Sequence, residues 1–196
     1  MFTGIVEHRG SVAHAEKGID AMRMVVDTGP LAAVELGGSI AVNGVCLTAI
    51  ETGSGQVTVE VVRETMDRST LGDLQSGDAI NLELPMRADG RFDGHIVQGH
   101  VDGVGEVLSV EPEGDGQRMR LAIPERLIRY MVEKGSITVD GVSLTIAAVN
   151  GLEIEVALIP HSLQMTTLGL RTEGEKVNLE ADVLAKYVER LLKADV

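Results

Sequence analysis

The chain has 196 residues, 44% of them hydrophobic and 24% charged, which is enough apolar material for a buried core and excludes a disordered chain. Its net charge of −13 at pH 7 argues against nucleic acid and anionic membranes as partners, because an acidic protein repels both. Two Phe, two Tyr and no Trp are also too few rings to stack the bases of a single strand.

The sequence also predicts a cellular compartment. A single cysteine, Cys46, rules out a disulfide within the chain and is typical of a reducing compartment. Glu7 and Arg9 come too early to leave room for the apolar region of a signal peptide. We therefore expect a soluble, cytoplasmic protein.

An internal repeat organises the chain. Residues 38–48 (GSIAVNGVCLT) and residues 135–145 (GSITVDGVSLT) are identical at eight of eleven positions, at an offset of 97 residues. Near the start, an offset of 95 relates Gly4 to Gly99. A period of this length is the size of a small domain, so the sequence indicates two tandem copies of one domain.

The first copy begins with signals of β-structure and one short helix. A proline at the start and glycines after the end predict a helix over residues 30–36. Asn43 and Gly44 lie between apolar runs and predict a type I′ hairpin turn. Residues 57–62 (VTVEVV) alternate in the manner of a half-buried strand. We expect about six short strands, which is typical of a compact barrel.

A linker separates the copies. Residues 85–94 (PMRADGRFDG) contain one Pro, two Gly and charges of both signs, as linkers do. We therefore expect one barrel domain over residues 1–89 and a second over residues 90–181. Residues 182–196 have no counterpart in the first copy and form a separate terminal segment.

The second copy repeats these signals and adds a terminal helix. A helix is expected over residues 124–134, a hairpin turn at Asp140-Gly141 and a strand over residues 152–158. Asp182 can cap a final amphipathic helix over residues 182–194. The apolar face of that helix must be buried on the chain's own barrels or against a partner subunit; it consists of Val183, Leu184, Tyr187, Val188, Leu191 and Leu192.

Five short motifs follow one another along the chain. They are MFTGIVE at residues 1–7, VNGVCLT at 42–48, GHVDG at 99–103, DGVSLT at 140–145 and TTLG at 166–169. In this order the motifs resemble those of the riboflavin synthase family of the α-chain type, and the resemblance extends from residue 1 to about residue 190.

The resemblance implies an architecture and a reaction. Each half is expected to be a six-stranded Greek-key barrel, and the terminal helix is expected to help form a homotrimer. The active site would lie between the N-terminal barrel of one subunit and the C-terminal barrel of another. Two molecules of 6,7-dimethyl-8-ribityllumazine would exchange a four-carbon unit, giving riboflavin and 5-amino-6-ribitylaminouracil without cofactor or metal. Lumazine synthase is a candidate partner.

The resemblance also implies catalytic candidates. His100 could move a proton near neutral pH, and the lumazine must lose one from its 7-methyl group; the alternative is a structural role in a glycine-rich turn. Ser143 could bind or add to ring carbon 7, or orient a water there. Cys46 could be a nucleophile, although we favour simple contact with the ligand. The nucleophile therefore stays open between Ser143, Cys46 and water.

Two further catalytic candidates have structural alternatives. Lys134 is expected beside the ligand, but a cation is also favoured at the end of the predicted helix. Asp182 is expected in the site or as a helix cap. The binding segments carried over from the family are Gly4, Ile5 and Val6; Cys46, Leu47 and Thr48; Glu60, Val61, Val62, Arg63, Glu64 and Thr65; Gly99, His100 and Val101; Lys134; Ser143, Leu144 and Thr145; and Ala157, Leu158, Ile159, Pro160, His161 and Ser162.

The two copies differ at positions where donor and acceptor roles would need different chemistry. Which barrel would hold the donor is open. The differing pairs are Cys46 and Ser143, Ile5 and His100, Glu64 and His161, and Asn43 and Asp140.

Three other functions are alternatives. A non-catalytic lumazine- or flavin-binding antenna protein would keep both barrels, but the survival of the catalytic candidates disfavours it. A single-strand-binding module is disfavoured by acidity and few aromatic residues. A flavin reductase would need a nicotinamide-binding half, for which the chain has no room.

Overall fold

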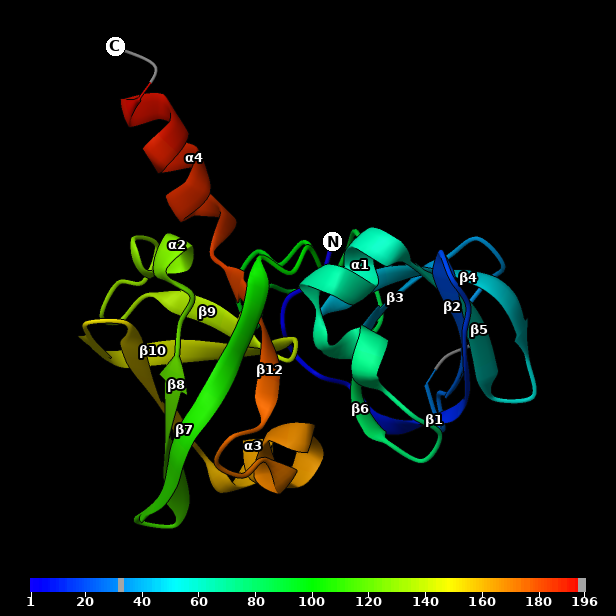
Figure 1. Cartoon of the computed structure of the whole chain (residues 1–196), viewed down its shortest axis with the longest axis horizontal. Helices are drawn as coiled ribbons and strands as arrows, with labels where there is room; N and C mark the ends of the chain where they lie inside the picture. Colours follow the sequence, from blue (N-terminus) through cyan, green and yellow to red (C-terminus); the bar gives the residue numbers. More distant parts are fainter. Residues whose placement is uncertain (32–33, 194–196) are drawn as a thin grey trace.

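The computed structural model describes residues 1–31 and 34–193, and it contains two closed antiparallel barrels of six strands each. The barrels lie side by side, and the C-terminal helix projects from the second barrel (Figure 1). The expected all-β fold with two six-stranded barrels and short helices is therefore confirmed.

Both barrels have the same strand order. The first closes in the order β1-β2-β5-β4-β3-β6, and the second closes in the equivalent order β7-β8-β11-β10-β9-β12. Pairing of non-consecutive strands, such as β2 with β5, is the Greek-key arrangement. The strands are β1 (His8–Lys17), β2 (Ala21–Asp27), β3 (Ser39–Val42), β4 (Val45–Gly53), β5 (Gln56–Val62), β6 (Ala79–Glu83), β7 (Gly103–Glu113), β8 (Gly116–Ala122), β9 (Ser136–Val139), β10 (Val142–Asn150), β11 (Glu153–Leu158) and β12 (Lys176–Ala181).

Each barrel encloses its own core. Alternation along the strands turns every second side chain inward, so Met22, Met24 and Val26 of β2 are buried while Arg23 is exposed. The equivalent strand β8 buries Met119 in the second barrel. Two separate cores explain why each repeat can close on itself as one domain.

The two predicted hairpin turns have the expected backbone and pack against each other. Asn43 and Gly44 have φ values of 45° and 77°, and Asp140 and Gly141 have 47° and 79°. Both turns therefore use positive φ at two successive positions, as type I′ turns require. A Cβ atom on Gly44 would lie 2.7 Å from the backbone nitrogen of Gly141, so glycine is needed for this contact.

Two buried asparagines also join the barrels, because each donates a hydrogen bond to a hairpin turn of the other barrel. The Nδ2 group of Asn81 in β6 donates to the carbonyl of Asp140 at 2.9 Å, and its Oδ1 accepts from the Thr167 amide at 2.8 Å. Asn178 in β12 makes the mirror contacts with the carbonyl of Asn43 at 2.9 Å and the amide of Thr70 at 2.7 Å. These bonds fix the relative orientation of the barrels.

The helices differ from the prediction. The helix expected over residues 124–134 is wrong in extent, because α2 covers only Glu125–Ile128. Lys134 instead has a φ of 67°, and its amide donates to the Ile146 carbonyl of β10 at 2.8 Å. The expected helix over 30–36 includes residues 32 and 33, which lie outside the described residues.

Two helices that the sequence analysis missed follow the fifth strand of each barrel. These are α1 (Arg63–Arg68) and α3 (Pro160–Met165), each followed by a 3-10 turn, η1 (Thr70–Asp73) or η2 (Thr167–Leu170). Their preceding residues, Val62 and Ile159, provide no capping side chain, although α3 does begin with a proline, Pro160.

The predicted terminal helix is present as α4 (Val183–Leu192), with Asp182 at its N-cap. The Asp182 carboxylate accepts the Leu184 amide at 2.9 Å. Of the expected apolar face, Val183 is buried and the other five side chains are 55–74% exposed, so that face is not covered by the chain's own barrels. Among the described helices, none has the length and apolar character needed to cross a membrane.

Candidate active site

The segment that precedes each barrel lies on the opposite barrel. The Gly4 carbonyl accepts the backbone amide of Ser143 at 2.7 Å, and the Gly99 carbonyl accepts that of Cys46 at 2.9 Å. Both glycines have positive φ, and a Cβ atom on either would lie within 2.7 Å of the Cβ atom of its partner residue. The strand that carries Ser143 is therefore bonded to the segment around Gly4 of the first repeat, and the strand that carries Cys46 is bonded to the segment around Gly99 of the second repeat. We call these two the glycine segments.

The first-barrel site is the cleft around Cys46. It has a volume of about 160 Å³. Strand β4, helix α1 and the segment after Gly99 provide its walls, so it combines both repeats. Its lining residues are Val45, Cys46, Glu64, Thr65, Arg68, Ser69, Gly99, His100 and Val101.

The second-barrel site is the equivalent region around Ser143. The Ser143 Oγ atom lies 2.7 Å from Nδ1 of His95, whose backbone amide donates to the Thr3 carbonyl at 3.1 Å. Burial lowers the pKa of His95, and this effect outweighs the attraction of the nearby Asp182 carboxylate. A neutral imidazole can accept the proton of the serine hydroxyl and make its oxygen more nucleophilic.

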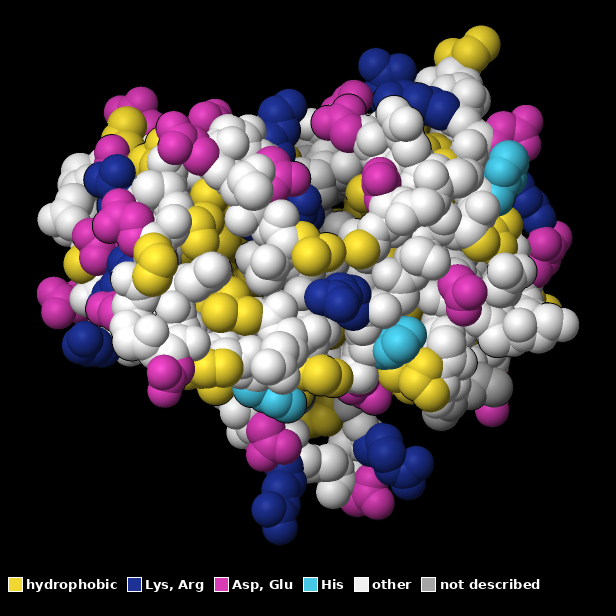
Figure 2. All heavy atoms as spheres, turned by 90° about the horizontal axis from the view of Figure 1, so that it is seen from below, with side chains coloured by type: hydrophobic (Ala, Val, Ile, Leu, Met, Phe, Trp, Pro, Cys, Tyr) yellow, Lys and Arg dark blue, Asp and Glu magenta, His cyan; other side chains and the backbone are white. Residues whose placement is uncertain are grey.

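The two sites are thus related in structure but different in chemistry. A thiol lies in one site and a hydroxyl at the equivalent position of the other, and a different histidine, His100 or His95, lies beside each. On the face of the molecule shown in Figure 2, acidic and basic side chains are interspersed rather than gathered in one basic area. This mixture fits a small-molecule site better than a nucleic-acid surface.

Comparison with known proteins agrees with the duplicated architecture. The model of the family described as "Lumazine binding domain" matches this chain twice, at residues 3–85 and 98–182. The riboflavin synthase of Mycobacterium tuberculosis (strain ATCC 25618 / H37Rv) is 48% identical over 99% of this chain and 99% of its own length. The chain belongs to the riboflavin synthase family. The Bacillus subtilis (strain 168) member is 43% identical, over 98% of this chain and 90% of its own length.

Solved structures share the fold of this riboflavin synthase family member. LumP complexed with 6,7-dimethyl-8-(1'-D-ribityl)lumazine matches with a TM-score of 0.83 at 27% identity, covering 92% of this chain and 99% of that chain. LumP complexed with riboflavin matches with a TM-score of 0.84 at 29% identity and the same coverage.

The structure separates the predicted catalytic candidates of this family member into two groups. Cys46 and His100 line the first-barrel site. Ser143 belongs to the second-barrel site. Asp182 is close enough to His95 to raise its pKa by charge attraction, and it also caps α4. His100 and Ser143 are therefore placed in different sites of one chain, which the sequence did not reveal.

The predicted binding segments alternate between exposed and buried side chains. Thr48 and Thr145 are exposed on β4 and β10, and His161 is exposed on α3. Some predicted contacts have side chains in the barrel cores and can offer a ligand only their backbone; these are Leu47, Val61, Leu144 and Leu158. Lys134 is exposed and lies in a turn beside β10. The prediction that it ends a helix is therefore wrong.

One residue of the second-barrel site, His95, is not among the candidates predicted from the sequence. It directly follows the predicted linker over residues 85–94. Its signal was weak because its contact with Ser143 spans 48 residues of sequence and depends on the docking of two segments.

Proposed function

We propose that the chain is a riboflavin synthase, which converts two molecules of 6,7-dimethyl-8-ribityllumazine into riboflavin and 5-amino-6-ribitylaminouracil. The observation that carries this proposal is the presence of two related but chemically different sites, each completed by the other repeat. One lumazine transfers a four-carbon unit to the other, so the main demand is to hold two like molecules in register. Such proximity can supply roughly 7–11 kcal/mol of the barrier.

The two sites have different tasks. In the second-barrel site, the His95–Ser143 pair at 2.7 Å favours addition of Ser143 or an oriented water to ring carbon 7. In the first-barrel site, the exposed His100 beside Cys46 is suited to accept a proton from the 7-methyl group of a lumazine. The role of Cys46 in this site is to contact the ligand.

We infer that the two tasks meet between subunits. One lumazine pair can use both His100 and Ser143 if the first-barrel site of one subunit faces the second-barrel site of a neighbour. The C-terminal helix supports such an assembly, because its polar side is tied to its own barrel. Lys186 pairs with Asp102 at 2.7 Å, and Glu189 pairs with Arg129 at 2.9 Å.

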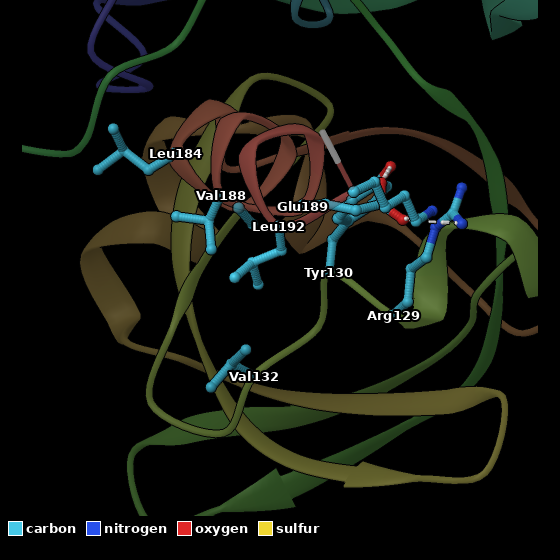
Figure 3. Close-up of a pocket in the computed structure, with 9 residues that line it drawn as sticks. Arg129, Tyr130, Val132, Leu184, Val188, Glu189 and Leu192 are labelled. Carbon is cyan, nitrogen blue, oxygen red and sulfur yellow. Dashed lines mark hydrogen bonds and ion pairs between the residues drawn. The ribbon is translucent and has the colours of Figure 1, made fainter. Parts of the chain in front are cut away.

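A largely apolar groove lies along α4 next to these ion pairs, and Arg129 and Glu189 are among its lining residues. Figure 3 shows Leu184, Val188 and Leu192 along the helix, with Val132 below them, while Arg129, Tyr130 and Glu189 cluster on the other side. The groove has a volume of about 520 Å³. Exposed apolar faces of this kind mark protein contacts, which supports burial of α4 in a homotrimer.

The location and a further partner are extensions of this function. The lone cysteine, half-buried and unpaired, supports a reducing cytoplasmic location. A lumazine synthase would supply the substrate, and we infer association with such an enzyme on that ground. Co-sedimentation of the two purified proteins, each with the other absent as control, tests the association.

A lumazine assay tests the function itself. The purified chain is incubated with 6,7-dimethyl-8-ribityllumazine, with no added metal or nucleotide, and the products are followed by absorbance and chromatography. Riboflavin is expected at half the lumazine consumed. Tight lumazine binding without riboflavin would instead establish the alternative, a non-catalytic antenna protein.

A further inference from the structure

Two buried carboxylates accept hydrogen bonds from the backbone segments that contact the proposed sites. Glu83 closes β6 and is 6% exposed, and Glu180 occupies the equivalent position of β12 and is 2% exposed. Buried carboxylates are costly unless their oxygens are satisfied by several hydrogen bonds. Here the donors come from the backbone of the two glycine segments.

Glu83 holds the segment at the start of the chain. Its Oε1 atom accepts the Thr3 amide at 2.6 Å and the Thr3 hydroxyl at 2.9 Å, and its Oε2 atom accepts the Gly4 amide at 3.1 Å. The carboxylate therefore fixes both residues that precede Ile5 and Val6, two predicted ligand contacts.

Glu180 holds the equivalent segment of the second repeat. Its Oε1 atom accepts the Gln98 amide at 2.8 Å, and its Oε2 atom accepts the amides of Gly99 and His100 at 3.0 Å each. Hydrogen bonds from N–H groups to a carboxylate are about twice as strong as neutral ones. Three of them in succession leave this backbone segment little freedom.

The assignment of carboxylate to site is crossed. Glu180 belongs to the second barrel, but the Gly99 that it holds presents its carbonyl to the Cys46 amide of the first barrel at 2.9 Å. Glu83 belongs to the first barrel, but Gly4 presents its carbonyl to the Ser143 amide of the second at 2.7 Å. Each carboxylate thus connects its own barrel to the site of the other.

Charged neighbours differ between the two carboxylates. Burial raises the pKa of both, and the backbone donors oppose that shift. Glu83 also faces Glu7, which raises its pKa further, whereas Glu180 faces Lys186, which lowers it, and Asp102, which raises it.

We propose that Glu83 and Glu180 are positioning residues, Glu180 for the first-barrel site around Cys46 and Glu83 for the second-barrel site around Ser143. The inference rests on the proposed function, because it takes these sites as ligand sites. A Glu180→Gln side chain keeps one acceptor oxygen but turns an amide donor toward backbone N–H groups. The Gly99 segment would then lose its register against Cys46.

The lone cysteine allows the first-barrel site to be tested separately. Alkylation of Cys46 by iodoacetamide is timed by mass spectrometry at increasing riboflavin, used as a non-reacting product probe. In the wild-type chain and in Glu83→Gln, riboflavin is expected to protect Cys46 at the same concentrations. In Glu180→Gln, protection should require about tenfold more riboflavin, or more, given the loss of charge-assisted bonds. Glu83→Gln should lower turnover despite unchanged protection.

The controls separate the outcomes. Far-UV circular dichroism and thermal unfolding establish that each variant is folded, and Glu180→Asp, whose shorter side chain cannot reach all three amides, provides a second variant with the charge retained. Wild-type protection in Glu180→Gln and Glu180→Asp would overturn the positioning role, and equal loss in Glu83→Gln would overturn the crossed assignment. No protection of the wild-type chain would instead overturn the first-barrel ligand site, and this inference with it.

Discussion

Single residues decide how the two equivalent positions differ. Ser143 has a histidine partner at 2.7 Å, while Cys46, its counterpart, lines a cleft with His100. Burial lowers the pKa of His95 and so favours its neutral imidazole. A neutral histidine beside a hydroxyl is the arrangement that makes a serine oxygen reactive or holds a water.

His95 and Ser143 are expected to act as one unit. Ser143→Ala and His95→Gln should each lower turnover by roughly a hundredfold or more, as loss of acid–base assistance does. The double variant should be little worse than either single variant, because both remove the same interaction. Steady-state kinetics of the four proteins measures this; multiplied losses would show that the two residues act independently.

The pH dependence of turnover follows from the same pair. Lowering the pKa of His95 favours the neutral form, so the imidazole is half-protonated only at a pH below the ordinary 6.5. Turnover should therefore fall at low pH with a midpoint below 6.5, and the His95→Gln variant should lack that decline. A decline through this residue with its midpoint above pH 6.5 would contradict the assignment.

At the scale of helices and strands, sequence patterns were sufficient to predict the strands and turns but not all of the helices. Alternation and turn residues predicted the strands and both hairpin turns, because those signals are local. They failed at α1 and α3, which begin without a capping side chain, and at residues 129–134, where turns follow α2 and the Lys134 amide bonds to β10. They also failed to show that each glycine segment lies on the opposite barrel, since this depends on how the barrels dock.

The divergence of Asn43 and Asp140, taken from sequence as a site asymmetry, has a structural explanation at the barrel junction. Asp140 is fully buried and pairs with Arg171 at 2.7 Å, whereas Asn43 has Leu74 at the position equivalent to Arg171. Asp140→Asn should destabilise the fold by about 3 kcal/mol, because it removes the nearer charge partner of the largely buried Arg171 and leaves only Glu175, at 3.5 Å.

A double variant provides the control for this pair. Asp140→Asn combined with Arg171→Leu reproduces the arrangement of the first repeat and should recover most of the lost stability. Urea unfolding of the single and double variants measures both effects. A double variant as unstable as the single one would show that the pair is not the cause.

The exposed apolar face of helix α4 is predicted to contact the neighbouring subunits. Val188→Asp should dissociate the proposed trimer and lower turnover while the barrels stay folded, because a charge cannot be buried in an apolar contact. Sedimentation measures the assembly. Ile19→Asp makes the same kind of exchange at an 86% exposed side chain in the β1–β2 turn and should leave the assembly intact. Loss of assembly in both variants would show a general effect of added charge.

At the scale of the whole molecule, duplication provides two sites of different chemistry, and the proposed assembly would bring unlike sites together. Mixed trimers test this claim most directly. His100→Gln impairs one site and Ser143→Ala the other, so the two variants are co-expressed and the mixed assemblies are assayed for riboflavin formation. Random pairing would leave roughly a quarter of the interfaces with both sites intact, and activity should rise toward a quarter of the wild-type value. Activity no higher than the mean of the two variants alone would contradict an active site shared between subunits.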